Sequence, residues 1–301
     1  MATNRKPEIS IGLPVYNGEN YLAEAIRSLQ DQTFGDFEII VSDNASQDAT
    51  EEIARDLAAG DDRIRYSRNE RNLGANPNYN RTFALAKGTY FRWHAHDDVC
   101  DPKYLEICRE VLANDPSVSL VHTRTAYIDR LGNPLLKLSR GYLDCDGFLE
   151  NLVTDEDAAA QLSSALPEKR LDAIVNRMSV FFDIFGLMRH DDVCRTLLLP
   201  NYYGADKVFL ADMAMQGRLV RLPEEAFARR CHPAASTRQT SLAALASWSN
   251  SARRFDFYPA LIMTGYVNAV RSSDLSAAEK ARCFAVIAKR FKSPYKVIRG
   301  R

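Results

Sequence analysis

The chain has 301 residues, of which 46% are hydrophobic and 26% charged, a composition typical of a globular protein with one large or two small domains. The formal net charge is zero at pH 7, which gives no support for a nucleic-acid partner. No N-terminal run resembles a signal peptide and no apolar stretch is long enough to span a bilayer, so we expect a cytoplasmic protein. The six cysteines are scattered without a C-x-x-C pair, which favours reduced thiols over a zinc ribbon or a disulfide framework.

Strands and helices are expected to alternate through the first half of the chain. Asp48 is the expected N-cap of the second helix, with Glu51 as its capping-box partner. Such alternation implies a mostly parallel sheet with right-handed crossovers. In chain order, the hydrophobic pattern predicts strand 9–13, helix 21–32, strand 37–41, helix 48–57, strand 64–66, helix 76–86, a strand ending at His94, helix 102–112, strand 118–126 and a turn at 129–133.

The second half of the chain is harder to interpret. Residues 139–177 lack clear periodicity and are rich in Asp, Glu, Ser and Ala, so we interpret them as a mobile or inserted region. A strand is predicted at 180–188 and a helix at 206–216, ended by Gly217. From residue 242 onward the pattern is helical.

Two adjacent carboxylates, Asp97 and Asp98, follow the strand that ends at His94. Ligands gather at the carboxyl ends of strands in open α/β sheets, and a carboxylate pair there is costly unless a cation is bound. Oxygen ligands of this kind suit Mg²⁺ or Mn²⁺ together with substrate phosphates. The segment therefore indicates a metal–diphosphate site, although an acidic loop capping the helix near Pro102 is the simpler alternative.

Four segments of the chain have the form of known motifs, and a second block follows later. These segments are Ile11 to Asn17, Ile40 to Thr50, Asn69 to Gly74 with Ala86 to Tyr90, and His96-Asp97-Asp98 with Pro102; the weaker second block runs from Gly204 to Pro233. Together they resemble the family-2 glycosyltransferases. The resemblance covers roughly residues 9–128 and implies an α/β fold of the GT-A type: a Rossmann-like, mostly parallel sheet flanked by helices, with a C-terminal helical extension. It implies a domain at 1–235, with a nucleotide-sugar-binding half (1–130) and an acceptor or catalytic half (131–235), before an extension at 236–301.

The resemblance assigns nucleotide-sugar-binding roles to residues after the first strands. Pro14, Tyr16 and Asn17 should form the wall of the base site, and Asp43 should bind the base or the ribose. The alternative for Asp43 is a structural cap on its own loop. Arg71 could meet the diphosphate or the base, and Asp97 should contact the donor.

The expected cofactor is a divalent metal, Mg²⁺ or Mn²⁺, held by Asp97 and Asp98 with diphosphate oxygens and with His232 as a further contact. Ala95 stands where the family has the first Asp of its Asp-x-Asp motif, so one ligand is missing. The alternative for His232 is a packed core histidine.

Asp206 is the candidate general base, because it begins a helix after Gly204 in the second block. Its alternative role is that of a helix N-cap. By resemblance, the reaction inverts the anomeric carbon. A nucleotide-diphospho-sugar would be the donor and a glycan or lipid-linked molecule the acceptor, in surface polysaccharide or glycoconjugate biosynthesis. Acceptor choice is assigned to 139–205.

Two other functions stay open at this point. A zinc-dependent metallohydrolase could use His94, His96, Asp97 and Asp98, completed by His122 or His232. A nucleotide-sugar-binding module without turnover is the other.

The last segment bears on location, because residues 279–301 contain eight Lys and Arg and one Glu. An apolar stripe of Phe284, Ile287, Ala288 and Phe291 makes this segment amphipathic. It could lie on the inner face of a membrane as a peripheral contact, or pack its stripe on the domain.

Overall fold

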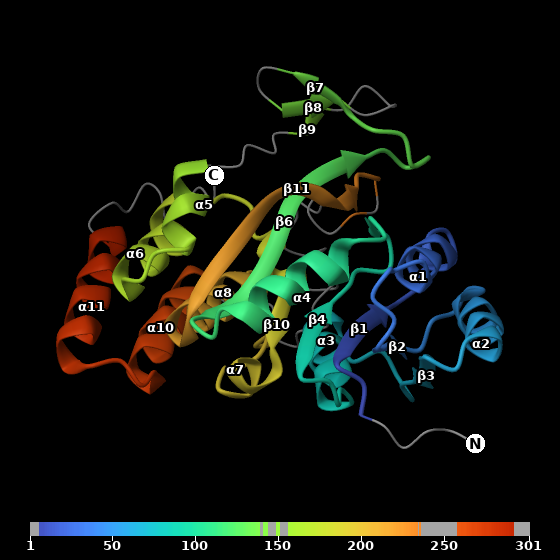
Figure 1. Cartoon of the computed structure of the whole chain (residues 1–301), viewed down its shortest axis with the longest axis horizontal. Coiled ribbons are helices and arrows are strands. Elements are labelled where there is room, and N and C mark those ends of the chain that lie inside the picture. Colours follow the sequence, from blue (N-terminus) through green and yellow to red (C-terminus); the bar gives the residue numbers. More distant parts are fainter. Residues whose placement is uncertain are drawn as a thin grey trace.

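A mixed eight-stranded sheet forms the centre of the protein in the computed structural model (Figure 1). The structure describes residues 6–138, 141–143, 149–150, 156–233, 235 and 258–291. The strands lie in the order β3 (Ile64–Arg68), β2 (Phe37–Asp43), β1 (Ile9–Val15), β4 (Tyr90–Trp93), β10 (Leu187–Arg189), β6 (Val118–Ile128), β11 (Arg218–Arg230) and β5 (Val99–Cys100).

The N-terminal half of the sheet is parallel, as its alternating sequence predicts. Strand β1 pairs in parallel with β2 and β4, and β2 pairs in parallel with β3. Beyond β4 the sheet is mixed, because β10 is antiparallel to both of its neighbours while β11 runs parallel to β6. The helices of this half are α1 (Leu22–Gln30), α2 (Thr50–Gly60), α3 (Ala75–Ala84) and α4 (Tyr104–Asn114).

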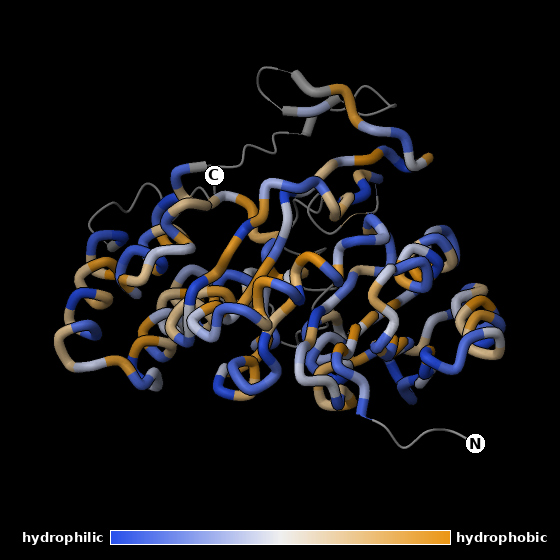
Figure 2. The backbone as a smooth tube through the Cα atoms, in the orientation of Figure 1, coloured by the Kyte–Doolittle hydropathy of each residue, from blue (hydrophilic) through white to orange (hydrophobic). Residues whose placement is uncertain are grey.

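Helices cover both faces of the sheet and divide the core into two main clusters. On one face, Leu13 of β1 packs in a cluster with Ile26 of α1 and Leu105 of α4. On the other, Trp93 of β4 packs with Phe83 of α3 and with α8 (Ala205–Gln216). Hydrophobic residues follow the central strands in Figure 2, while the outer faces of the peripheral helices are hydrophilic.

Helix α8 is buried on all sides, because further helices cover the face that it turns away from the sheet. Tyr266 of α10 (Tyr258–Ser272) belongs to the same core cluster as α8. Cys283 and Ile287 of α11 (Ala277–Phe291) are also buried there, and Arg282 forms an ion pair with Glu168 at 2.8 Å. The described residues of the C-terminal extension therefore share one core with the sheet domain.

This packing bears on the expected membrane contact. The apolar stripe of α11 faces the protein through Ile287 and the partly buried Phe284. This corresponds to the second of the two roles considered for the segment, in which its stripe packs on the domain. Residues 292–301, which hold half of the basic residues counted above, lie outside the described part. Among the described residues, none of the helices combines the length and the apolar character that crossing a bilayer requires.

One strand prediction for the second half was wrong. Residues 180–188 are not one strand: a 3₁₀ turn occupies Phe182–Phe185 and only Leu187–Arg189 is β10, because buried Asp183 turns to pair with Arg221 at 2.6 Å. The region interpreted as mobile or inserted is helical over its last part, where Leu162, Leu171 and Ile174 are buried. Its described elements are α5 (Glu156–Leu162), α6 (Pro167–Asp172), a π-helical turn (Ala173–Arg177), and the strands β8 (Gly141–Leu143) and β9 (Leu149–Glu150), which form a small sheet with β7 (Leu136–Leu138).

Trp93 is the side chain on which we expect the core beside α8 to depend most. It is fully buried, 5.0 Å from the Phe209 ring, and its indole nitrogen donates to the Tyr79 carbonyl at 2.9 Å. Trp93→Ala should lower the free energy of unfolding by about 3–5 kcal/mol, measured by urea denaturation. The control Leu166→Ala, at a site 42% exposed, should stay within about 0.5 kcal/mol. Equal effects of the two substitutions would contradict this packing.

Candidate active site

The loops after three neighbouring parallel strands meet at one edge of the sheet. Val15 at the end of β1 lies beside Asp43 at the end of β2, and Gly12 of β1 lies beside Trp93 at the end of β4. The loops that follow these strands contain most of the residues predicted for the site. Because parallel strands end at a common edge, this is where an open α/β sheet binds ligands.

Asp43 is fully buried at the end of β2, and both of its carboxylate oxygens accept hydrogen bonds. Oδ2 accepts from the Tyr66 hydroxyl and from Arg68 Nη1, both at 2.7 Å, while Oδ1 accepts from the Ser46 amide at 2.8 Å. Burial and the bond to Asp43 raise the pKa of Tyr66. Asp43 therefore has the structural role that was given as its alternative, because its carboxylate fixes its own loop.

Arg68 is a residue that the sequence did not single out. Besides Asp43, its guanidinium donates to the Ser46 carbonyl at 2.8 Å and lies 3.2 Å from Glu51. Glu51 is thus not the capping-box partner of Asp48; the Asp48 carboxylate itself accepts from the Thr50 amide at 3.1 Å. The sequence feature that could have indicated this role was the position of Arg68 at the end of the third strand.

The remaining nucleotide-site residues differ in their exposure. Pro14 is buried within β1, so it supports the site from inside, whereas Tyr16 is 42% exposed and its ring is accessible. Asn17 has a positive φ of 51° and accepts from the Gln47 amide at 2.9 Å, which joins the loops after β1 and β2. Arg71 is exposed in the loop before α3.

The structure places His232 beside the Asp97-Asp98 pair, although these residues are far apart in the sequence. His232 Nε2 lies 2.9 Å from Asp97 Oδ2. Asp98 is buried, and its Oδ1 accepts from the Arg230 amide at 2.9 Å. The two adjacent carboxylates therefore differ in role: Asp97 points to His232, whereas Asp98 anchors the end of β11.

Their electrostatics differ in the same way. Burial raises the pKa of Asp98, and the neighbouring charge of Asp97 raises it further. Burial opposes the ionisation of Asp97 as well, but His96, His232 and Arg229 outweigh it and hold its pKa below the usual range. Asp97 is thus the carboxylate of the pair that stays charged.

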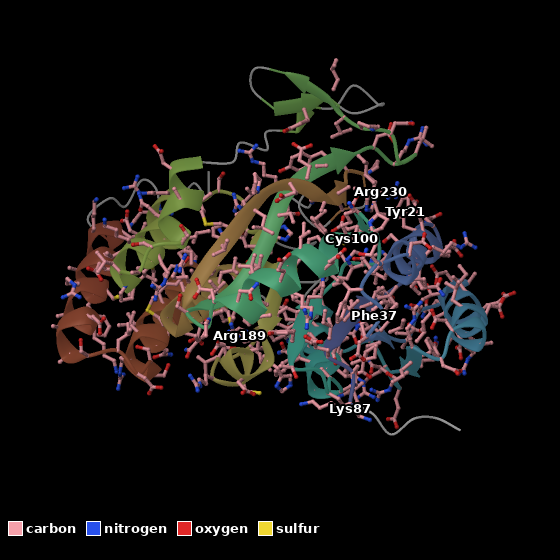
Figure 3. The ribbon with its side chains drawn as sticks, in the orientation of Figure 1. Tyr21, Phe37, Lys87, Cys100, Arg189 and Arg230 are labelled. Atoms are coloured by element: carbon pink, nitrogen blue, oxygen red, sulfur yellow. The ribbon has the colours of Figure 1, made fainter. Side chains whose placement is uncertain are left out.

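Arg230 holds this arrangement in place, although the sequence analysis assigned it no role. Its side chain is buried, and Nε donates to the Asp97 carbonyl at 2.9 Å. It also forms an ion pair with Glu24 at 2.7 Å and lies over the Tyr21 ring, 4.8 Å from its centroid (Figure 3). The Tyr21 ring in turn lies 5.0 Å from His232.

The zinc centre considered from the sequence is not formed. His94 is fully buried, between Arg92 Nη2 at 3.2 Å from its Nδ1 and the Asp98 carbonyl at 3.1 Å from its Nε2. His122 is buried elsewhere, with Nδ1 2.8 Å from the Tyr104 hydroxyl. Within the described ranges, there is no group of three or more His, Cys, Asp or Glu residues that could hold a metal ion.

Asp206 lies in the first turn of α8, after Gly204 with a φ of 85°. It is half-buried, and burial raises the pKa of its carboxyl while Lys207 acts in the opposite direction. The environment thus shifts this carboxyl toward a stronger base. The structure links Asp206 to the Asp97 loop only indirectly, through Phe209 of α8 packed on Trp93 of β4.

Comparison with known proteins decides the family. Residues 10–165, more than half of the chain, match the model described as Glycosyl transferase family 2. The chain belongs to this family. The resemblance found from its motifs is confirmed, and the metallohydrolase alternative is overturned.

Curated relatives match part of this family-2 glycosyltransferase. An uncharacterised glycosyltransferase of Methanocaldococcus jannaschii is 37% identical over 132 residues, 43% of this chain and 46% of that one. Chondroitin synthase of Escherichia coli is 32% identical over 46% of this chain and 20% of its own. The GalNAc(5)-diNAcBac-PP-undecaprenol beta-1,3-glucosyltransferase of Campylobacter jejuni is 33% identical over 44% and 39%. The chain spans less than half the length of these relatives.

Solved structures match almost the whole chain. TarS of S. aureus, residues 1–349 in complex with UDP-GlcNAc, has a TM-score of 0.66 at 18% identity, over 95% of this chain and 73% of that one. A mannosyltransferase of Pyrobaculum calidifontis, in complex with GDP-Man and Mn²⁺, has a TM-score of 0.55 at 15% identity, over 97% and 83%. These likenesses confirm the α/β GT-A fold with its C-terminal helices.

The buried position of His122 generates a prediction for stability. Burial lowers the pKa of His122 to about 3, from about 6.5 in an unfolded chain. Between these values the unfolded state binds the proton more tightly, so acidification destabilises the fold by about 1.4 kcal/mol per pH unit. Relative to His122→Gln, wild type should lose unfolding free energy at that rate below pH 6.5, measured by urea denaturation. From pH 7 to 8 the difference should be constant; a constant difference down to pH 4 would contradict a neutral His122.

Proposed function

We propose that this protein transfers a sugar from a nucleotide-diphosphate donor to a hydroxyl of a glycan or lipid-linked acceptor, in surface polysaccharide or glycoconjugate biosynthesis. The observation that carries the proposal is the family-2 segment, residues 10–165, with Asp43 at the end of β2 and Asp97 after β4, the two strands that pair with β1 on either side. Relatives named as chondroitin synthase and as an undecaprenol-linked glucosyltransferase support the acceptor classes. Residues 1–130 would form the donor half and 131–235 the acceptor half.

The donor nucleotide would bind between the loops after β1 and β2. The exposed Tyr16 ring could stack on the base, with Asn17 fixing the loop that carries it. Asp43, held in place by its hydrogen bonds with Tyr66 and Arg68, would contact the base or the ribose. The exposed Arg71 would bind the diphosphate. TarS, the structural neighbour with UDP-GlcNAc bound, supports a nucleotide-sugar in this fold.

Asp97 and His232 would hold a divalent metal, Mg²⁺ or Mn²⁺. Asp97 Oδ2 and His232 Nε2 lie 2.9 Å apart, so a carboxylate and an imidazole, two side chains that can bind such ions, converge at one place. Diphosphate oxygens and water would supply the other positions, which fits Ala95 in place of a further carboxylate. Asp98, engaged with the Arg230 amide, would support the loop, and the ion would stabilise charge on the leaving diphosphate.

Asp206 would act as the general base. Its carboxyl is half-buried with a raised pKa, and it would accept the proton of the acceptor hydroxyl as that oxygen attacks the anomeric carbon. A single displacement of this kind breaks the bond to the diphosphate and inverts the configuration. A binding module without turnover would have no need of this group.

A thermal-shift screen tests the donor site. UDP, GDP, dTDP and CDP are each added with Mn²⁺ or with EDTA to wild type and to Asp97→Ala, with the 95% exposed Asp191→Ala as control. One nucleotide should raise the melting temperature by a few degrees with Mn²⁺, since a ligand at a hundredfold excess over its Kd stabilises by about 2.7 kcal/mol. EDTA or Asp97→Ala should abolish the shift. No shift with any nucleotide would refute the proposed donor site.

Substitution of the base separates turnover from binding. With the donor that the screen identifies, Asp206→Asn should lower kcat by about 10²–10⁴-fold and leave the nucleotide Kd unchanged. Transfer is measured by nucleotide release coupled to acceptor glycosylation, with Asp191→Asn as the matched control. A variant that keeps its kcat within threefold would assign the proton transfer to another group.

A further inference from the structure

Helix α3 presents asparagine side chains on two different faces. Asn76 and Asn80 are one helical turn apart and therefore share a face, while Asn78 lies between them in sequence and points elsewhere. Asn76 and Asn78 are buried and Asn80 is half-buried. Such side chains require hydrogen-bond partners, and those partners lie in two separate parts of the site.

Asn76 and Asn80 bind the backbone of the loop that precedes α8. Asn76 Nδ2 donates to the carbonyls of Pro200 at 2.7 Å and Tyr202 at 2.9 Å. Asn80 Nδ2 donates to the Leu199 carbonyl at 2.9 Å, and its Oδ1 accepts from the Leu199 amide at 3.1 Å. Four hydrogen bonds to three loop residues thus come from two side chains of one helix.

Asn78 fixes the same helix to the donor half. Its Nδ2 donates to the Ser42 carbonyl at 2.8 Å, and its Oδ1 accepts from the Ser42 hydroxyl at 2.7 Å. Asn69 bridges Asn78 to Asn44 with bonds of 2.9 and 3.0 Å. Ser42 and Asn44 flank Asp43, so α3 is joined directly to the proposed nucleotide site.

The loop held by Asn76 and Asn80 leads directly into Asp206. Only Tyr203, Gly204 and Ala205 separate the bound Tyr202 carbonyl from it. Gly204 has a φ of 85°, a conformation that favours glycine, and a Cβ there would lie 2.8 Å from the Ile262 Cδ1 atom, which would have to shift. Leu198, at the start of the loop, has a φ of 56°, which is costly for leucine and persists only where neighbouring contacts enforce it.

We propose that Asn76 and Asn80 are positioning residues that set the place of Asp206 relative to the bound donor. This inference rests on the proposed function, in which Asp43 serves the donor and Asp206 the acceptor hydroxyl. Helix α3 carries the alignment, with Asn78 on the donor side and Asn76 and Asn80 on the acceptor side. A base that is displaced by about 1 Å loses up to about 100-fold in rate without any change in donor binding.

Asn76→Asp and Asn80→Asp test the proposal, because a carboxylate keeps the size of the amide but repels the loop carbonyls. Each should lower kcat by about 10- to 100-fold and leave the nucleotide Kd within twofold. Asn176→Asp is the matched control, since Asn176 Nδ2 donates to Asp172 Oδ1 at 2.9 Å, on the π-helical turn. It should lose stability without loss of kcat. A parallel loss of kcat and nucleotide affinity in Asn76→Asp would overturn the proposal.

Hydrogen exchange distinguishes failure of the proposal from failure of the proposed function. In Asn76→Asp and Asn80→Asp, the amides of residues 198–206 should exchange at least tenfold faster, while those of 42–46 stay as in wild type. Unchanged exchange at 198–206 would overturn the positioning role whatever the activity. If wild type transfers sugar from no donor, the proposed function fails, and the exchange rates still decide whether these asparagines hold the loop.

Discussion

A guanidinium buried where separate segments converge is the interaction on which the candidate site depends. Arg230 donates from Nε to the Asp97 carbonyl at 2.9 Å and from Nη1 to the Asp129 carbonyl at 3.3 Å, while its own amide binds Asp98. Burying a cation is costly unless such partners and a counter-charge, here Glu24, compensate. The same bonds fix the end of β11, and His232 follows it by two residues. Arg230 therefore helps to hold the His232 imidazole 2.9 Å from Asp97.

The three carboxylates of the site differ in their role because their surroundings differ. Both oxygens of Asp43 are used by the protein, and Asp98 is buried against the Arg230 amide, so each mainly orders a loop. Asp97 is 18% exposed, and His96 and His232 favour its charged form. Burial and the charge of Asp97 oppose the ionisation of Asp98, so the negative charge of the pair is concentrated on Asp97.

Local pattern was sufficient for the parallel half and insufficient for the rest. The strands at 9–13 and 37–41 are mostly apolar, with Ser10 and Glu38 as the polar exceptions, so their burial could be expected from the sequence. The 13-residue β11 was missed because charged residues and Pro223 interrupt it, and its pairing with β6 shifts register between Leu222 and Phe227. Arg68 and Arg230 escaped notice for a related reason. Their roles depend on carbonyls and carboxylates from distant segments of the chain, whereas the motif residues Asp43, Asp97 and Asp98 could be recognised by resemblance alone.

The two loops that would do the chemistry are both held by side chains that bind backbone carbonyls. Arg230 does this for residue 97, and Asn76 and Asn80 do it for residues 199–202. Apolar packing such as Trp93 on Phe209 is non-directional and tolerates small shifts, but hydrogen bonds weaken steeply when their geometry changes. Directional contacts therefore select one placement of each loop from among those that the core would allow. Because α3 and β11 belong to the sheet domain, the contacts that place each loop come from the protein itself, which is what electrostatic stabilisation without reorganisation requires.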